Sequence, residues 1–159
     1  MSTSAIDPGQ LRSLVIAPAL AALGLASPAA EELLLGTALQ ETGGGHWLHQ
    51  LGAGPAIGLY QMEPATHDDI WKSFLASHAE LAAKVTSLTV PGLSKLAQLA
   101  GNLYYATAMT RIFYDRVPEP LPAAGDIAAQ AAYYKAHYNT PLGAATTAQY
   151  LENWHKAFA

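Results

Sequence analysis

Glu41 is the one carboxylate of this chain that falls on a predicted apolar helix face. That face consists of residues spaced i, i+3, i+4, i+7, i+8 and i+11, namely Ala30, Leu33, Leu34, Thr37, Ala38 and Glu41. Burial disfavours the charged form of a carboxyl group and raises its pKa. A carboxylic acid that stays protonated near neutral pH can protonate a leaving oxygen, as glycoside cleavage requires.

Glu41 also has a plain structural interpretation. It lies in the last turn of its helix, just before Gly43-Gly44-Gly45, and a carboxylate at a helix end is often solvated. Glu31 and Glu32 lie at the opposite end of the helix, where the helix dipole favours negative charge. The spacing alone therefore leaves a catalytic Glu41 and a solvated Glu41 both open.

The helix that carries Glu41 has clear start and stop signals. Ser27 is a favourable N-cap, Pro28 suits the first turn, and Gly43 suits the position after the last turn. These signals predict a helix over residues 28–42.

Comparable signals organise the rest of the chain. A first helix is expected to begin at Asp7-Pro8, to continue through an apolar stretch and to bend or break at Pro18. Residues 57–61, after a glycine-rich loop, suit a short strand or hairpin arm. Further helices are predicted over residues 64–75, 79–85, 94–116, 126–138 and 146–157. We therefore expect one all-α (mainly helical α+β) domain over residues 1–159, with a small β-hairpin-like insert near residues 52–62.

Composition and charge exclude several classes of function. The chain has 159 residues, of which 51% are hydrophobic and 13% charged, and this favours one compact helical domain. Its net charge of −4, without a cluster of Lys and Arg, argues against nucleic acid as a partner. Because the chain has no cysteine, a disulfide framework, a Cys nucleophile and a thiolate metal site are excluded.

The sequence shows no signal for export or for a membrane span. Residues 1–8 lack the positive charge that begins a secretory signal peptide. The apolar stretch from Leu14 to Leu25 is interrupted by Pro18 and Gly24 and is too short to cross a bilayer. We therefore expect synthesis in the cytoplasm, no Sec-dependent export and no stable membrane insertion.

Two segments of the chain resemble the lysozyme-like superfamily, in its branch of soluble lytic transglycosylases and goose-type lysozymes. They are residues 35–42 (LGTALQET) and residues 58–66 (GLYQMEPAT). That family pairs a Glu-Ser at a helix end with a Gly-Leu-Met-Gln-x-x-Pro-x-Thr segment. Thr42 therefore stands in place of the usual Ser, and Tyr60 in place of the usual Met.

A third segment, residues 133–141 (YYKAHYNTP), resembles the late Tyr-Asn-Ala-Gly motif of the same family. The motif would place Tyr138 and Asn139 in the wall of the cleft, with the tyrosine hydroxyl steadying the catalytic carboxyl or the acetamido group of the substrate. Asn102 matches a further family position. The three segments follow the family's order and cover most of residues 33–143.

The resemblance implies roles for the residues of the first two segments. Glu41 would be the general acid and then the general base. Gln61, with Tyr60 beside it, would bind sugar across the cleft, and Thr42 would offer a hydroxyl at the cleft edge. Core packing or helix capping explains each of these supporting residues equally well.

A second carboxylate is a separate question, because glycosidases generally use two. Glu63, Asp68 and Asp69 are the candidates, but all three also suit the positive end of the helix that begins at Pro64. The resemblance supplies another route, in which one Glu is sufficient because the N-acetyl group of the substrate assists. Glu63 is kept as the candidate for the second carboxylate.

The histidines do not predict a metal centre. His46 and His49 lie three residues apart in the glycine-rich loop, and His67 precedes Asp68-Asp69. A zinc site needs three or four ligands that converge, and this spacing does not provide them. We expect no metal, and the resemblance implies no cofactor.

Two hypotheses from different classes follow. The first is a monomeric peptidoglycan glycosidase that acts on the glycan strands of the bacterial cell wall. The short chain and the lack of a signal peptide resemble a bacteriophage member of the family. It would reach the wall through a membrane lesion or as part of the virion. The second is a virion component or sugar-binding protein that keeps the fold without turnover. Hydrolysis and transglycosylation are both left open by the sequence.

Overall fold

The computed structural model of the chain describes residues 4–140 and 142–159. Helices make up 63% of the chain, and the described residues form no sheet. The all-α class predicted from the sequence is therefore confirmed. No helix in the described part of the chain is long and apolar enough to cross a membrane.

The first helical stretch runs without interruption through Pro18. It consists of α1 (Pro8–Gln10), the π-helical segment η1 (Leu11–Ile16) and α2 (Ala17–Leu23). Of the bend or break predicted at Pro18, the break is therefore wrong. Proline has no N–H to offer the carbonyl of Leu14, four residues earlier, and the hydroxyl of Tyr104 donates to that carbonyl instead at 3.0 Å.

Helix α3 (Pro28–Thr42) has the bounds that the sequence predicted. The hydroxyl of Ser27 accepts a hydrogen bond from the backbone N–H of Ala30, and Gly43 ends the helix with a φ of 60°. The helix is buried on more than the predicted face, because it packs against η1 and three other helices. It is the central helix of the fold.

A second group of helices follows the glycine-rich loop. It comprises α4 (Pro64–Asp69), the π-helical η2 (Ile70–Phe74), the short η3 (Leu75–Ser77), α5 (Ala79–Ser87), α6 (Lys95–Gly101) and α7 (Leu103–Asp115).

The single helix predicted over residues 94–116 is wrong, because the chain turns at Asn102 between α6 and α7. Asn102 caps α7 by accepting from the backbone N–H of Tyr105, and its amide donates to the Leu88 carbonyl and to Gln98. Asn102 therefore fixes a corner of the fold.

The last helices are α8 (Ile127–Tyr134), the π-helical η4 (Lys135–Asn139) and α9 (Thr147–Ala157). The hydroxyl of Thr146 and the side chain of Gln149 form a reciprocal capping box at the start of α9. The side chain of Tyr150 in α9 lies against Gly36 of α3, where an added Cβ would overlap the tyrosine hydroxyl. Glycine at position 36 therefore permits the close approach of α9 to the central helix.

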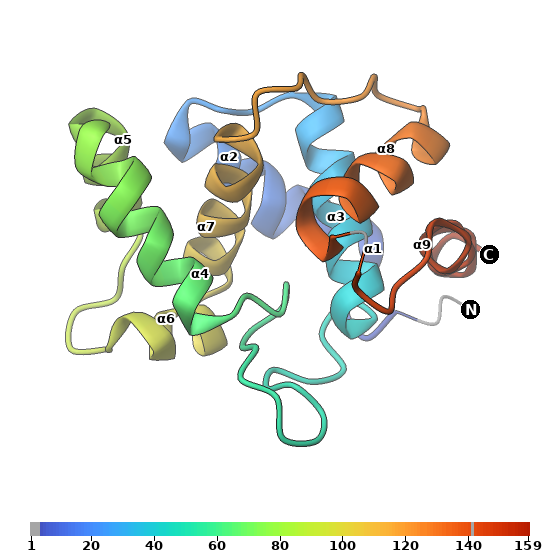
Figure 1. Cartoon of the computed structure of the whole chain (residues 1–159), viewed down its shortest axis with the longest axis horizontal. Coiled ribbons are helices and arrows are strands. Elements are labelled where there is room, and N and C mark those ends of the chain that lie inside the picture. Colours follow the sequence, from blue (N-terminus) through green and yellow to red (C-terminus); the bar gives the residue numbers. More distant parts are fainter. Residues whose placement is uncertain (1–3, 141) are drawn as a thin grey trace.

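The described part of the chain has two hydrophobic cores, and α7 contributes to both. The helices that carry them form two neighbouring groups (Figure 1). We call the first the tyrosine core; it is built mainly on α3, α8 and α9, and its aromatic members are Tyr60, Tyr114, Tyr133, Tyr134 and Tyr150. We call the second the aliphatic core; it is built mainly on α4 to α7, and its members are Leu23, Met62, Ile70, Leu75, Val85, Leu99, Tyr105, Ala108, Met109 and Ile112.

The loop between α3 and α4 joins the two cores at one end of the molecule (Figure 1). It contains no strand among the described residues. Two isolated antiparallel bridges, His49 with Ile57 and Ile57 with Met62, close it. The predicted insert is thus a loop with hairpin-like bridges rather than an extended hairpin.

Candidate active site

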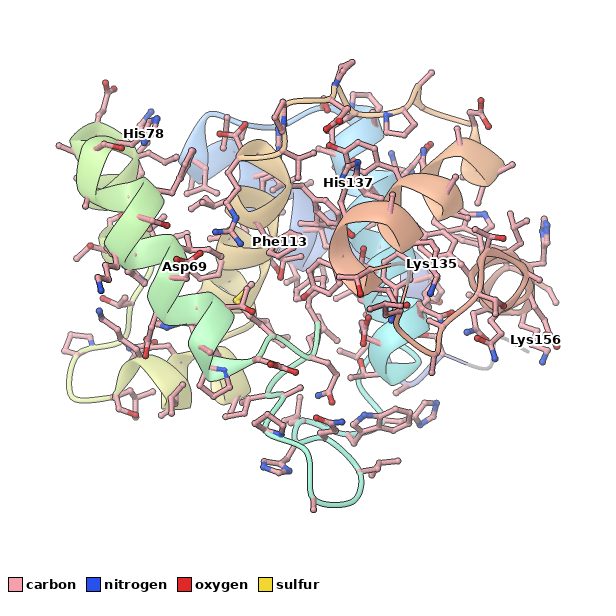
Figure 2. The ribbon with its side chains drawn as sticks, in the orientation of Figure 1. Asp69, His78, Phe113, Lys135, His137 and Lys156 are labelled. Carbon is pink, nitrogen blue, oxygen red and sulfur yellow. The ribbon has the colours of Figure 1, made fainter. Side chains whose placement is uncertain are left out.

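A cleft of about 580 Å³ lies where the two cores meet. Its lining comes from the end of α3, from the loop between Trp47 and Glu63, and from Thr66 of α4, Phe113 of α7 and the segment 138–140. Phe113 lies near the middle of the molecule, on the part of α7 between α4 and α8 (Figure 2). Segments far apart in the sequence therefore share one cavity.

Glu41 lies in the last turn of α3 and lines the cleft. Its side chain is half-buried, and burial raises the pKa of the Glu41 carboxyl from 4.5 to about 7. A hydrogen bond from Tyr134 opposes that rise in pKa but is the smaller effect. A substantial fraction of Glu41 is therefore protonated at neutral pH.

Tyr134 of α8 is the residue that holds the Glu41 carboxyl. Its hydroxyl donates to Oε1 of Glu41 at 2.5 Å. Burial, and next the charge of Glu41, raise the pKa of Tyr134 far above its usual range, so the hydroxyl stays a donor. The sequence places Tyr134 in the predicted helix 126–138 and in the segment 133–141 but indicates no role for it. Its position one helical turn before Tyr138 was the only available signal.

Tyr138 lines the cleft, and its hydroxyl contacts the loop rather than Glu41. Its hydroxyl donates to the backbone carbonyl of Tyr60 at 2.7 Å, so it braces the loop against η4. Its ring lies 5.9 Å from that of Tyr134, centroid to centroid, in a stacked arrangement. Burial and the charge of Glu41 raise the pKa of Tyr138 well above its usual range.

Thr42 and Tyr60 are buried, and neither side chain lines the cleft. The Thr42 hydroxyl donates to the Leu59 carbonyl at 2.8 Å and accepts from the backbone N–H of Gly45 at 3.0 Å. The Tyr60 hydroxyl pairs with Thr107 of α7 at 2.8 Å. In this geometry both residues tie the loop to its neighbours instead of presenting a hydroxyl to the cavity.

Gln61 and Asn139 come from distant parts of the sequence, and both line the cleft. The Gln61 amide nitrogen donates to the Gly58 carbonyl at 3.0 Å, and Asn139 Oδ1 accepts from the Lys135 ammonium at 2.9 Å. One polar atom of each side-chain amide is therefore fixed by a hydrogen bond within the protein.

Backbone strain is concentrated at the same cavity. Gln61 has a φ of 50° and Thr140 a φ of 71°, and these are the non-glycine residues with positive φ in the described part of the chain. Both line the cleft. Strained backbone of this kind is found preferentially at functional sites, where the surrounding structure holds it in place.

Of the three candidates for a second carboxylate, Glu63 alone lines the cleft. It is exposed and immediately precedes α4. Asp68 pairs with the ring of His67 at 2.9 Å, and Asp69 forms an ion pair with Arg116 at 2.8 Å. Asp68 and Asp69 thus have structural partners.

His67 belongs to a buried hydrogen-bond network, unlike His46 and His49, which lie in the glycine-rich loop. Its Nε2 lies 2.7 Å from the Tyr105 hydroxyl, which also accepts from the indole N–H of Trp71 at 3.0 Å. Burial lowers the pKa of His67. Within residues 4–140 and 142–159, no three His, Asp or Glu side chains converge as a metal ion would require.

Trp47 is one of several cleft residues that the sequence patterns did not assign to the site. It is half-buried and lines the cavity together with Glu41. It follows the glycine-rich turn after α3, and nothing in the local pattern places its side chain beside the end of that helix.

Comparisons with models of protein families, with curated proteins and with solved structures give no match. What the site can do is therefore argued from its own residues: a carboxylic acid with a raised pKa, a tyrosine hydroxyl on one of its oxygens, and a cavity large enough for sugar rings.

Proposed function

We propose that this protein is a peptidoglycan glycosidase that cleaves the β-1,4 bond between N-acetylmuramic acid and N-acetylglucosamine, with Glu41 as general acid and base. The observation that carries the proposal is the Glu41 carboxyl, which lines the cleft with its pKa raised to about 7. The motifs of residues 35–42, 58–66 and 133–141 add the resemblance to lytic transglycosylases and goose-type lysozymes.

The contacts of Glu41 suggest how the reaction runs. Tyr134 donates to Oε1, so Oε2 is the oxygen that carries the acidic proton. That proton passes to the glycosidic oxygen as its bond to C1 breaks, and the N-acetyl group of the substrate stabilises the developing positive charge. The Glu41 carboxylate then accepts a proton from the attacking hydroxyl group.

Hydrolysis and transglycosylation differ in which O–H group attacks. Attack by water gives a reducing end, whereas attack by the 6-hydroxyl of the same muramic acid gives an anhydro end. Glu63 is exposed in the same cleft and is the carboxylate available to direct a water molecule. In this proposal the protein is a monomeric, lysozyme-like enzyme of bacteriophage origin that acts on the cell wall.

The test compares the wild type with Glu41→Gln on purified peptidoglycan, with released muropeptides followed by mass spectrometry. We expect the variant to lose activity by at least about 10³-fold, because the amide cannot donate an acidic proton. The matched control is Glu152→Gln on the surface of α9, where Glu152 pairs with Lys156.

Equal release by the wild type and Glu41→Gln would remove Glu41 from the mechanism. Glycan binding without release by the wild type would instead favour a sugar-binding or virion protein that keeps the fold. Anhydro ends identify a transglycosylase, and reducing ends identify a lysozyme.

A further inference from the structure

Trp47 differs from the other two tryptophans in its surroundings. The indole N–H of Trp71 donates to Tyr105, and the ring of Trp154 packs against Phe158 at 5.0 Å between centroids. Trp47 is half-buried in the wall of the cleft that holds Glu41, and within the described residues its indole has neither a hydrogen-bond partner nor a stacking ring.

Amide groups with uncommitted ends line the same cavity. The side-chain oxygen of Gln50 accepts from the backbone N–H of Ala56 at 3.1 Å, which leaves its Nε2 uncommitted. The Nε2 of Gln61 and the Oδ1 of Asn139 are likewise engaged, which leaves Gln61 Oε1 and Asn139 Nδ2 without partners among the described residues. The cleft therefore offers both donors and an acceptor, which suits the hydroxyl and acetamido groups of a sugar.

The charge of the lining selects among sugars. Glu63 lines the cleft as an exposed carboxylate, and none of the lining residues described is Lys, Arg or His. Lys135 of η4 donates to Asn139 and, at 2.7 Å, to the Gly143 carbonyl, and it is not one of the lining residues. A free carboxylate on the bound sugar would therefore meet the negative charge of Glu63 with no cation among the described lining residues.

We propose that Trp47 forms a stacking subsite for an uncharged N-acetylhexosamine ring, one that does not carry a free carboxylate. The assignment rests on the proposed function and adds a specificity-determining residue to it. An indole covers the apolar face of a sugar ring over a large area while its edge stays in contact with water. The neighbouring amides then hold the polar rim of the sugar.

The experiment measures binding without turnover. In the Glu41→Gln background, chitotetraose (four uncharged N-acetylglucosamine units) is titrated while tryptophan emission and calorimetric heat are recorded. We expect the emission to change on binding, Trp47→Ala to weaken affinity by about tenfold or more, and Trp47→Phe to weaken it by less than about threefold. Trp154→Phe, the matched control, keeps both the affinity and the emission change.

A second probe tests the charge argument. A hyaluronan tetrasaccharide alternates N-acetylglucosamine with a carboxylated sugar, and we expect it to bind at least about tenfold more weakly than chitotetraose. The far-ultraviolet circular dichroism of each variant reports whether it is folded.

The outcomes separate the subsite from the activity. If a folded Trp47→Ala binds chitotetraose as tightly as its parent, or if hyaluronan binds as tightly as chitotetraose, the subsite is overturned whether or not peptidoglycan is cleaved. If chitotetraose binds through Trp47 and the wild type releases no muropeptide, the subsite stands and the proposed glycosidase activity fails.

Discussion

The tyrosine core and the aliphatic core handle buried polar groups in different ways. The tyrosine core contains many hydroxyl groups, each engaged locally: Tyr114 pairs with Thr37 at 2.8 Å, and Tyr134 donates to Glu41. The aliphatic core has few, and they are gathered in the network of His67, Tyr105 and Trp71.

This difference matches what each core does for the cleft. On the tyrosine side, burial raises the pKa of Glu41, while an oriented hydroxyl keeps its carboxyl in one position. On the aliphatic side, Gly58 of the loop packs directly against the backbone of α6, so the opposite wall is held by close packing. Burial and hydrogen bonding control the pKa and position of Glu41 on one side of the cleft. Close backbone packing fixes the position of the other wall.

Gly58→Ala should have the largest effect, because it disrupts the wall that rests on the aliphatic core. Gly58 has a φ of 87°, and an added Cβ would overlap the carbonyl oxygen of Leu99. We expect the free energy of unfolding, measured by urea denaturation, to fall by about 4 kcal/mol from backbone strain and overlap together.

Gly52→Ala is the matched control for that substitution. Gly52 has a similar φ of 85°, but an added Cβ would meet nothing within 4 Å. It should cost only the backbone strain, about 1 to 2 kcal/mol. Equal losses in the two variants would mean that the contact with α6 contributes nothing.

The two cores should also respond to pH with opposite sign. The folded pKa of Glu41 lies above its unfolded value, so its contribution to stability is present below pH 4.5 and is lost as the pH rises through about 7. The folded pKa of His67 is lowered, so its contribution is present above pH 6.5 and is lost as the pH falls.

Urea denaturation of two variants across pH 4.5 to 8 measures this contrast. Relative to the wild type, Glu41→Gln should gain up to about 3 kcal/mol of unfolding free energy as the pH rises through this range. His67→Gln should remove the wild type's loss of stability on the acidic side. Parallel curves for the wild type and both variants would contradict the assignment of these two groups.

Tyr134→Phe should have the smallest effect of these substitutions. It tests whether the tyrosine core positions the Glu41 carboxyl for catalysis. Removing the hydroxyl should lower kcat by about tenfold, because Glu41 loses the donor on Oε1. Since that hydrogen bond lowers the pKa of Glu41, the basic limb of the pH–rate profile should move to higher pH. Tyr150→Phe, in the same core, should leave the profile in place; a profile unchanged by Tyr134→Phe would exclude Tyr134 as a positioning residue.

Local signals predicted much of the fold. The bounds of α3 follow from Ser27, Pro28 and Gly43, and the start of α9 follows from Thr146. Caps and prolines act within one turn of the helix, so they can be read from neighbouring residues. The corner at Asn102 could not be predicted, because the carbonyl of Leu88 that binds its amide lies 14 residues away in the sequence.

The sequence by itself determined that a carboxylate, Glu41, ends an apolar helix, because helical spacing and the residue types alone place it there. Only the tertiary structure decided what surrounds it. Tyr134 holds its carboxyl from 93 residues away, Trp47 and Gln61 reach the same cavity, and Thr42 and Tyr60 turn out of it. Burial and side-chain partners are set by which elements pack together, and no local pattern encodes that packing.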